Sequence, residues 1–182
     1  MTNFSPARRQ LMLGLGSMAM FSVISSPAMA SRSTQGSRML SMFNRHTQEE
    51  GKGAYWVDGK YQKEILTDFD HLLRDHRANV AAPMDKRLYD LLFHLQENLK
   101  TQDTIHIISG YRSPQTNAKL ANKSGGVAKK SLHMEGKAID IAIPGIRLDR
   151  LRDAAKELKL GGVGYYPQSG FVHVDVGRVR SW

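Results

Sequence analysis

Apolar residues recur at helical spacing in two long segments of the chain. The first covers residues 63–77, and the second opens near Pro83 and Asp85. Both segments predict amphipathic helices, because residues three or four apart lie on the same helix face. Shorter helices are expected over residues 114–123 and 148–160, where proline or glycine marks an end. The apolar positions of the two long helices are Ile65, Phe69, Leu72, Leu73, Leu88, Leu91, Leu92, Leu95 and Leu99.

The remaining apolar runs are short and rich in β-branched residues, which favours strands. A hairpin is expected over residues 42–61, with Asp58 and Gly59 at a turn. A tight turn over residues 167–170 should join the last two strands. The fold class predicted from this order is α+β, with N-terminal helices packed on a small, mainly antiparallel sheet. The expected single strands are residues 104–109, 138–143, 163–166 and 171–176.

The first forty residues differ in character from the rest. Arg8 and Arg9 precede an apolar stretch over residues 11–24, and Ala28-Met29-Ala30 follows as a cleavage signal. Residues 1–30 therefore predict an export signal, and the paired arginines favour the twin-arginine route over an ordinary secretory signal. Residues 31–41 are small and polar, which predicts a flexible leader. We expect one domain over residues 42–182, working in the periplasm with no membrane span once the signal is removed.

Composition narrows the chemistry that this domain can use. The chain has no cysteine, which excludes disulfides, thiolate metal sites and cysteine nucleophiles. The formal net charge is +9, but the basic residues are scattered and match no nucleic-acid-binding motif. No nucleic-acid partner is therefore expected. An anionic envelope polymer suits an exported basic protein better, although an ordinary solvated surface carries such charge too. The oligomeric state is left open.

Two of the late strands place metal-binding residue types on their polar faces. In residues 138–143 the isoleucines point one way and Asp140 points the other, and in residues 171–176 His173 opposes the valines. His133 precedes Asp140 in a glycine-containing segment that could fold back over the sheet. Two imidazoles and one carboxylate with an open fourth position are typical of catalytic zinc. The alternative is that both histidines are ordinary loop and strand residues.

Three sequence blocks in this order resemble the M15 family of zinc peptidases. The first is Ser109-Gly110-Tyr111-Arg112-Ser113, the second runs from Ser131 to Asp140 with the pattern H-x-x-G-x-A-x-D, and the third is residues 171–175. The runs 126–131 and 161–167 are similar to an exported branch of murein endopeptidases. The resemblance implies zinc-dependent cleavage of peptidoglycan cross-links, and for this branch the link between two diaminopimelate residues.

The resemblance also implies roles for individual residues. His133, Asp140 and His173 would be the zinc ligands, and Arg112 would hold a substrate carboxylate or an oxyanion. Many family members carry an acid three residues before the last ligand, but Gly170 stands there in this chain. Asp175 is the expected substitute as catalytic acid or base. Its alternative role is to orient a ligand imidazole through a hydrogen bond.

Three functions remain open at this point. The first is a zinc-dependent murein endopeptidase. The second is a zinc D,D- or L,D-carboxypeptidase that trims wall peptides, because the same metal chemistry serves either bond. The third is a peptidoglycan-binding module whose metal is structural or absent, which the missing acid at Gly170 keeps in consideration.

Overall fold

The computed structural model describes residues 36–123, 128 and 130–182. The predicted export signal over residues 1–30, including the arginine pair, lies outside the described residues, as do residues 31–35 of the predicted leader. Within the described ranges the chain forms four α-helices and one eight-stranded sheet, so the α+β class is confirmed.

The sheet is larger and more mixed than predicted. Its strand order is β3-β2-β1-β4-β5-β7-β6-β8. The pairs β1–β4 and β6–β8 are parallel, and the other pairs are antiparallel. The prediction of a small, mainly antiparallel sheet is wrong, because the predicted hairpin joins the same sheet as the later strands, through the parallel pair β1–β4. The strands are β1 Ser37–Asn44, β2 Glu50–Val57, β3 Lys60–Tyr61, β4 Ile105–Ser109, β5 Ala138–Ala142, β6 Gly162–Tyr166, β7 Phe171–Asp175 and β8 Arg180–Ser181.

The predicted leader and the predicted order of elements both need correction at β1. Residues 37–41 are not a flexible leader but the first half of that strand, so the first described elements are strands rather than N-terminal helices. Its side chains alternate, with Leu40 and Met42 buried and Met39 exposed. In the sequence this alternation is hard to recognise, because the segment consists largely of small, polar residues. The predicted hairpin is present, but it starts at Ser37, and its Asp58-Gly59 turn joins β2 to β3.

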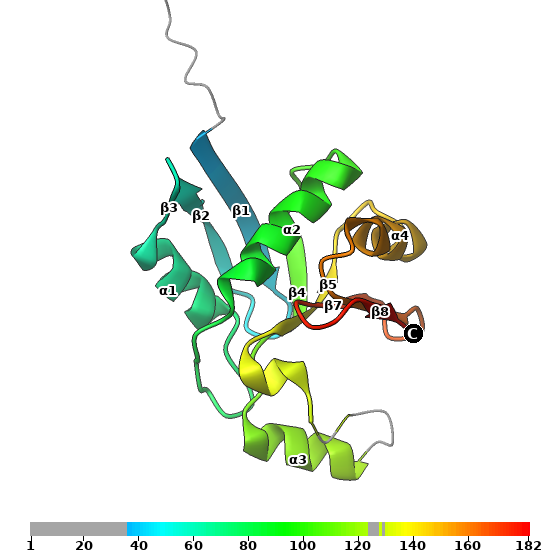
Figure 1. Cartoon of the computed structure of the whole chain (residues 1–182). Helices are drawn as coiled ribbons and strands as arrows, with labels where there is room; N and C mark the ends of the chain where they lie inside the picture. Colours follow the sequence, from blue (N-terminus) through cyan, green and yellow to red (C-terminus); the bar gives the residue numbers. More distant parts are fainter. Residues whose placement is uncertain (1–35, 124–127, 129) are drawn as a thin grey trace, which may run out of the picture. The chain divides into compact units, whose positions relative to one another are not determined.

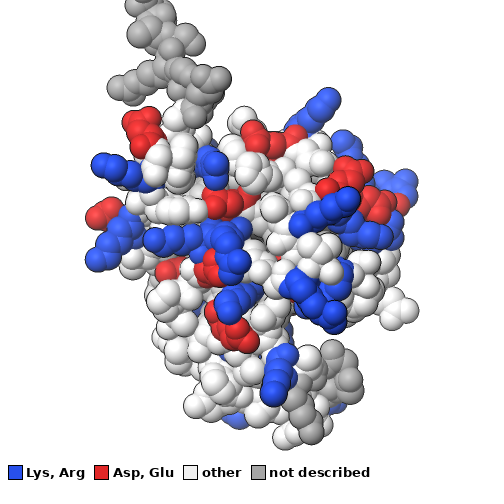
Figure 2. Space-filling view, viewed as in Figure 1, with Lys and Arg blue, Asp and Glu red and all other residues white. Residues whose placement is uncertain are grey.

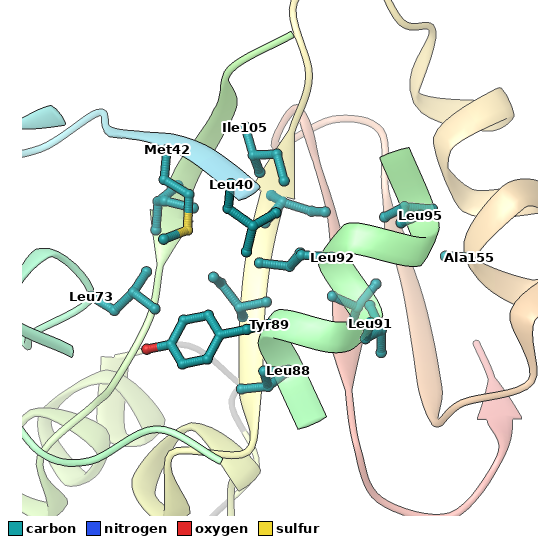
Figure 3. Close-up of a cluster of buried hydrophobic side chains, with 14 of the residues drawn as sticks. Leu40, Met42, Leu73, Leu88, Tyr89, Leu91, Leu92, Leu95, Ile105 and Ala155 are labelled. Atoms are coloured by element: carbon teal, nitrogen blue, oxygen red, sulfur yellow. The ribbon is translucent and has the colours of Figure 1, made fainter. Parts of the chain in front are cut away.

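The helices are α1 Lys63–Leu72, α2 Lys86–Leu99, α3 Pro114–Lys123 and α4 Leu148–Leu158. Helices α1, α2 and α4 pack on the sheet and form the core with it, whereas α3 lies away from the sheet (Figure 1). Helix α2 packs on β1 and α4, and α4 packs on β6 and β7. Figure 3 shows the leucines of α2 pointing into a cluster with Leu40 and Met42 from β1 and Ile105 from β4. The predicted helical apolar faces are therefore confirmed as core-facing.

Helix α1 ends five residues before the predicted boundary. The chain turns after Leu73, and the buried Asp75 carboxylate accepts hydrogen bonds from the backbone N–H groups of Arg77 and Ala78. A short bridge then pairs Asp75 with Val80. An aspartate that bonds to the backbone two residues on favours a turn over a helix. This turn carries Asp75 to the edge of the candidate site.

The charged surface shows no single basic patch in the view of Figure 2, where Lys and Arg alternate with Asp and Glu. Mixed signs of this kind are typical of a solvated protein surface. Within the described ranges, no helix combines the length and the apolar character needed to cross a membrane.

Candidate metal centre

Three neighbouring strands bring the predicted ligands to one level of the sheet. Asp140 on β5 lies opposite Ser109 of β4 on one side and His173 of β7 on the other. The isoleucines of β5 and the valines of β7 point to the helix-covered face and are buried there. Asp140 and His173 therefore share the opposite face, as strand alternation predicts. Asp140 and His173 are only 6% and 9% exposed, so the site is largely shielded from water.

A short 3₁₀ helix, η2 Leu132–Glu135, brings His133 over the same face. Ser131 caps its start by accepting a hydrogen bond from the His133 N–H, and Gly136 ends it with a φ of 65°. A β-carbon at Gly136 would lie 2.5 Å from the Pro83 carbonyl oxygen. Both the left-handed backbone and this close approach favour glycine at this position. The glycine of the H-x-x-G pattern thus sets the path of the loop that delivers His133.

The three predicted ligand atoms converge. His173 Nδ1 lies 2.8 Å from Asp140 Oδ1 and 3.2 Å from His133 Nε2. His133 Nε2 lies 3.3 Å from Asp140 Oδ1. Among the described residues, these are the three whose ligand atoms could hold one metal ion. The structure therefore brings together all three residues that the sequence singled out.

Hydrogen bonds on the outer ring nitrogens define which tautomer each histidine takes. His133 Nδ1 lies 2.8 Å from the Gly110 carbonyl oxygen, which accepts hydrogen bonds but cannot donate them. His173 Nε2 lies 3.2 Å from Asp175 Oδ2, a carboxylate oxygen. With hydrogens on these outer nitrogens, His133 Nε2 and His173 Nδ1 keep free lone pairs. Both lone pairs face the Asp140 oxygen.

This donor set fits a divalent cation. Two nitrogen lone pairs and a carboxylate oxygen at such short separations repel one another unless a proton or a metal ion lies between them. Zinc bonds of about 2.0–2.2 Å at tetrahedral angles place neighbouring ligand atoms about 3.3 Å apart. The observed separations of 2.8, 3.2 and 3.3 Å are close to that value. Burial raises the pKa of Asp140, but the two histidines in their protonated form outweigh that effect and hold the pKa below its usual range.

Asp175 lies on the side of His173 away from the ligand atoms. Its side chain is fully buried. Oδ1 accepts hydrogen bonds from the N–H groups of Gly162 and Gly177 and from Arg180, and Oδ2 accepts from Arg180 and His173. Burial raises the pKa of Asp175, but the hydrogen bonds from His173 and Arg180 hold it below the usual range. Both carboxylate oxygens of Asp175 are therefore occupied by hydrogen bonds to groups other than the three ligand atoms.

Arg112 is held beside the cluster by backbone and side-chain contacts. Its N–H donates to the His133 carbonyl oxygen at 3.1 Å, and its guanidinium donates to Asn117 Oδ1 and Ser109 Oγ at 3.3 Å each. The buried Nε–H has no hydrogen-bond partner within the described part of the chain. Burial lowers the pKa of Arg112, and the nearby Asp140 partly offsets this. A desolvated guanidinium with an unused donor is suited to bind an anionic oxygen.

Asp75 anchors the residue that follows Arg112. Its Oδ2 accepts hydrogen bonds from the Ser113 N–H at 2.9 Å and the Ser113 hydroxyl at 2.7 Å. Asp75 is 2% exposed. Burial raises the pKa of Asp75, but hydrogen bonds from Ser113 and Thr116 outweigh it and lower the pKa to about 2.

This lowered pKa predicts an acid-sensitive contribution to stability. The contribution of Asp75 should be complete above its unfolded pKa of about 4 and should be lost as the pH falls towards 2. Between pH 5 and pH 3, the free energy of urea unfolding should fall by about 1 kcal/mol more in the native protein than in Asp75→Asn. Equal pH dependence in the two proteins would show that the Asp75 carboxylate is not preferentially stabilised in the fold.

Several residues of the site were missed at the sequence level. The Gly110 carbonyl and Asp75 give no sequence signal, because one is a backbone atom and the other lies far along the chain. Arg180 pairs with Asp175 across a loop, and the spacing of the two residues in the sequence matches neither a helix face nor a strand face. Glu135, at the end of η2, pairs with Lys137 in an exposed contact. Gly170 lies in the turn between β6 and β7 with a φ of 74°, so no acid comes from that position.

Comparison with known proteins finds relatives along the full length of the chain. A family model described as peptidoglycan L,D-endopeptidase MepK matches residues 32–182. The chain is 44% identical over 183 residues to peptidoglycan L,D-endopeptidase MepK of Escherichia coli K12, with 100% of both chains covered. It is 38% identical over 182 residues to the probable peptidoglycan L,D-endopeptidase MepK of Haemophilus influenzae, which covers 99% of this chain and 98% of that protein. The chain therefore belongs to the M15 peptidase family of MepK-type peptidoglycan L,D-endopeptidases.

Proposed function

We propose that this protein is a zinc-dependent endopeptidase that hydrolyses L,D-peptide cross-links of peptidoglycan, including links between two diaminopimelate residues. The observation that carries the proposal is the convergence of His133 Nε2, Asp140 Oδ1 and His173 Nδ1 within 2.8–3.3 Å. Three protein ligands leave one tetrahedral position open, which is the arrangement of catalytic rather than structural zinc. Family membership and the names of the relatives support the same substrate class.

His133, Asp140 and His173 would hold the zinc ion. When bound, zinc lowers the pKa of a coordinated water and polarises the scissile carbonyl, which supplies a nucleophile at neutral pH. The Arg112 guanidinium would bind the oxygen on which negative charge develops, or a carboxylate of the substrate. Its anchoring to Ser109, Asn117 and the His133 backbone means that this donor needs little rearrangement when substrate binds.

Of the two roles considered for Asp175, the contacts favour orientation of His173 over transfer of a proton to the substrate. A carboxylate that is fully buried and bonded to Arg180 and two backbone N–H groups is poorly placed to collect a proton from water. Its bond to His173 Nε2 holds a hydrogen on that nitrogen and leaves Nδ1 for the metal. Asp175 is therefore a positioning residue, and Arg180 holds it in turn.

Substitution of Asp175 by asparagine tests that role. We expect zinc affinity to fall roughly 10- to 100-fold, as it does when such outer partners of ligand histidines are changed. The measurement is competition for zinc with a chelator of known affinity. A direct proton-transfer role would instead lower kcat at saturating zinc while zinc affinity stayed at the native value.

Digestion of defined muropeptides separates the candidate activities. The substrates are a dimer joined by the link between two diaminopimelate residues, a dimer joined through D-alanine, and the matching monomers. We expect the first dimer to yield monomers by mass spectrometry, with little change in the second dimer or in the monomers. Loss of one terminal residue from monomers would instead establish the carboxypeptidase. Binding to isolated sacculi with no released product would establish the binding module.

We further propose that the mature protein works in the periplasm, where its polymeric substrate lies. The support is the export signal predicted over residues 1–30 and the substrate named for the relatives. The twin-arginine route rests on Arg8 and Arg9 alone. Changing both to lysine should block export if that route is used, whereas an ordinary secretory signal would tolerate the exchange.

A further inference from the structure

Two glycines in β6 allow side chains from the sheet edge to reach the candidate metal centre. Gly162 and Gly164 point to the same face as His173, because Gly164 lies opposite His173 in the register. A β-carbon at Gly162 would lie 2.3 Å from the Arg180 guanidinium, and one at Gly164 would lie 2.8 Å from two ring carbons of Trp182. Arg180 and Trp182 therefore reach across β6 to β7. Glycine within a strand often marks such a close approach.

The Trp182 ring lies directly beside a candidate zinc ligand. Its centroid is 5.3 Å from the centroid of the His173 ring. The indole N–H donates to the Tyr166 hydroxyl at 2.7 Å, and the Tyr166 ring stacks on Phe171 at 4.7 Å. Trp182 is still 51% exposed and is one of five large apolar residues on the surface of the described ranges. The indole is therefore a half-exposed apolar surface that is held in a fixed position next to the buried ligand cluster.

Trp182 and Arg112 lie on opposite sides of the ligand cluster. Arg112 contacts Ser109 on β4, two strands to one side of His173, while Trp182 follows β8, two strands to the other side. An extended substrate with its carbonyl at the ligand atoms and an anionic group at Arg112 would therefore continue over Trp182. The Arg180 guanidinium already lies 4.7 Å from the centre of the Trp182 ring. That cation disfavours a substrate ammonium group at the ring and favours a methylene chain.

We propose that Trp182, supported by Tyr166 and Phe171, forms a binding subsite for the aliphatic part of the cross-linking diamino acid, on the side of the metal centre opposite Arg112. The proposal rests on the function proposed above. It makes Trp182 a specificity-determining residue that contacts substrate and binds no metal. The glycines at positions 162 and 164 are then the feature that lets edge-strand side chains reach the site.

Steady-state kinetics on the cross-linked dimer test the subsite. Trp182→Ala should raise KM roughly tenfold with kcat within about twofold of native, because uniform substrate binding is lost. Trp182→Phe should recover most of the affinity.

Val179→Ala is the matched control, since Val179 is 60% exposed in the adjacent loop and its substitution should leave both constants unchanged. Chelator competition should give native zinc affinity for Trp182→Ala. A native KM in this variant, or a KM change accompanied by weakened zinc binding, overturns the proposal.

A fluorescence titration tests contact without turnover. The chain has two tryptophans, so Trp56→Phe leaves Trp182 as the one reporter. Combined with His133→Ala to prevent cleavage, this protein should show a blue shift and saturable intensity change when the intact dimer is added. The same titration with the monomer lacking the cross-link should need roughly tenfold more peptide. An unchanged Trp182 spectrum at saturating dimer contradicts the subsite. Failure of the native enzyme to cleave any dimer would contradict the proposed function instead, so the two outcomes are distinguishable.

Discussion

Replacing His133 by alanine should abolish both zinc retention and cross-link hydrolysis. His133 supplies one of three ligand atoms, and two remaining ligands hold zinc weakly after dialysis. Because the metal supplies several kcal/mol of transition-state stabilisation, the rate should fall roughly a thousandfold or more. The measurements are zinc content per chain and the rate of dimer disappearance. The fold should persist, because the His133 side chain belongs to η2 rather than to the hydrophobic core.

The matched control is His94→Ala. His94 lies on α2, and its half-exposed side chain contacts Glu97 and no part of the ligand cluster. Its removal should leave zinc content and rate at native values. A thermal melt of each variant separates loss of the ligand from loss of the fold. If His133→Ala kept its zinc and its rate, the ligand assignment would be wrong.

Replacing Arg112 by alanine should lower kcat/KM roughly 100- to 1,000-fold, the usual cost of removing one donor to a developing oxyanion. Arg112→Lys should recover only part of this loss, because an ammonium cannot reproduce the forked donors held by Ser109 and Asn117. Zinc content should remain native in both variants, since Arg112 donates no ligand atom. This combination of retained metal and lost rate distinguishes Arg112 from the ligands.

The control for Arg112 is Arg87→Lys on α2, where the side chain is 63% exposed and pairs with Asp85. It should retain native kinetics. If Arg112→Ala left kcat/KM within threefold of native, the guanidinium would have no part in the reaction. Its unpartnered Nε–H would then be a feature of packing alone.

Strand alternation in the sequence was sufficient to place Asp140 and His173 on one face, because each strand carries a full apolar face opposite its polar residue. His133 depended on its motif, since a short 3₁₀ helix leaves no periodicity. The strand β1 was missed because its buried Leu40 and Met42 alternate within small polar residues that resemble a leader. Arg180 and Trp182 were missed because their contacts cross β6, and the register that aligns them with His173 is a tertiary property.

The two glycines of β6 are a sequence signal that side chains of a neighbouring strand cross this strand. Glycine at alternate positions of a strand leaves one face without side chains, and a neighbour can then cross it. Residues 161–167 resemble an exported branch of the family, but that resemblance gives no physical reason for the glycines. Their physical meaning depends on knowing that β8 lies beside β6, and a two-residue edge strand has no sequence signal of its own.

Zinc removal and restoration on one defined substrate test the central claim most directly. The native protein is stripped with a chelator, dialysed, and incubated with the dimer joined by the link between two diaminopimelate residues. We predict no monomer product from the stripped protein, and recovery of the native rate when one equivalent of zinc per chain is returned. Native cleavage by the stripped protein, or no cleavage by the zinc-loaded protein, would contradict the account.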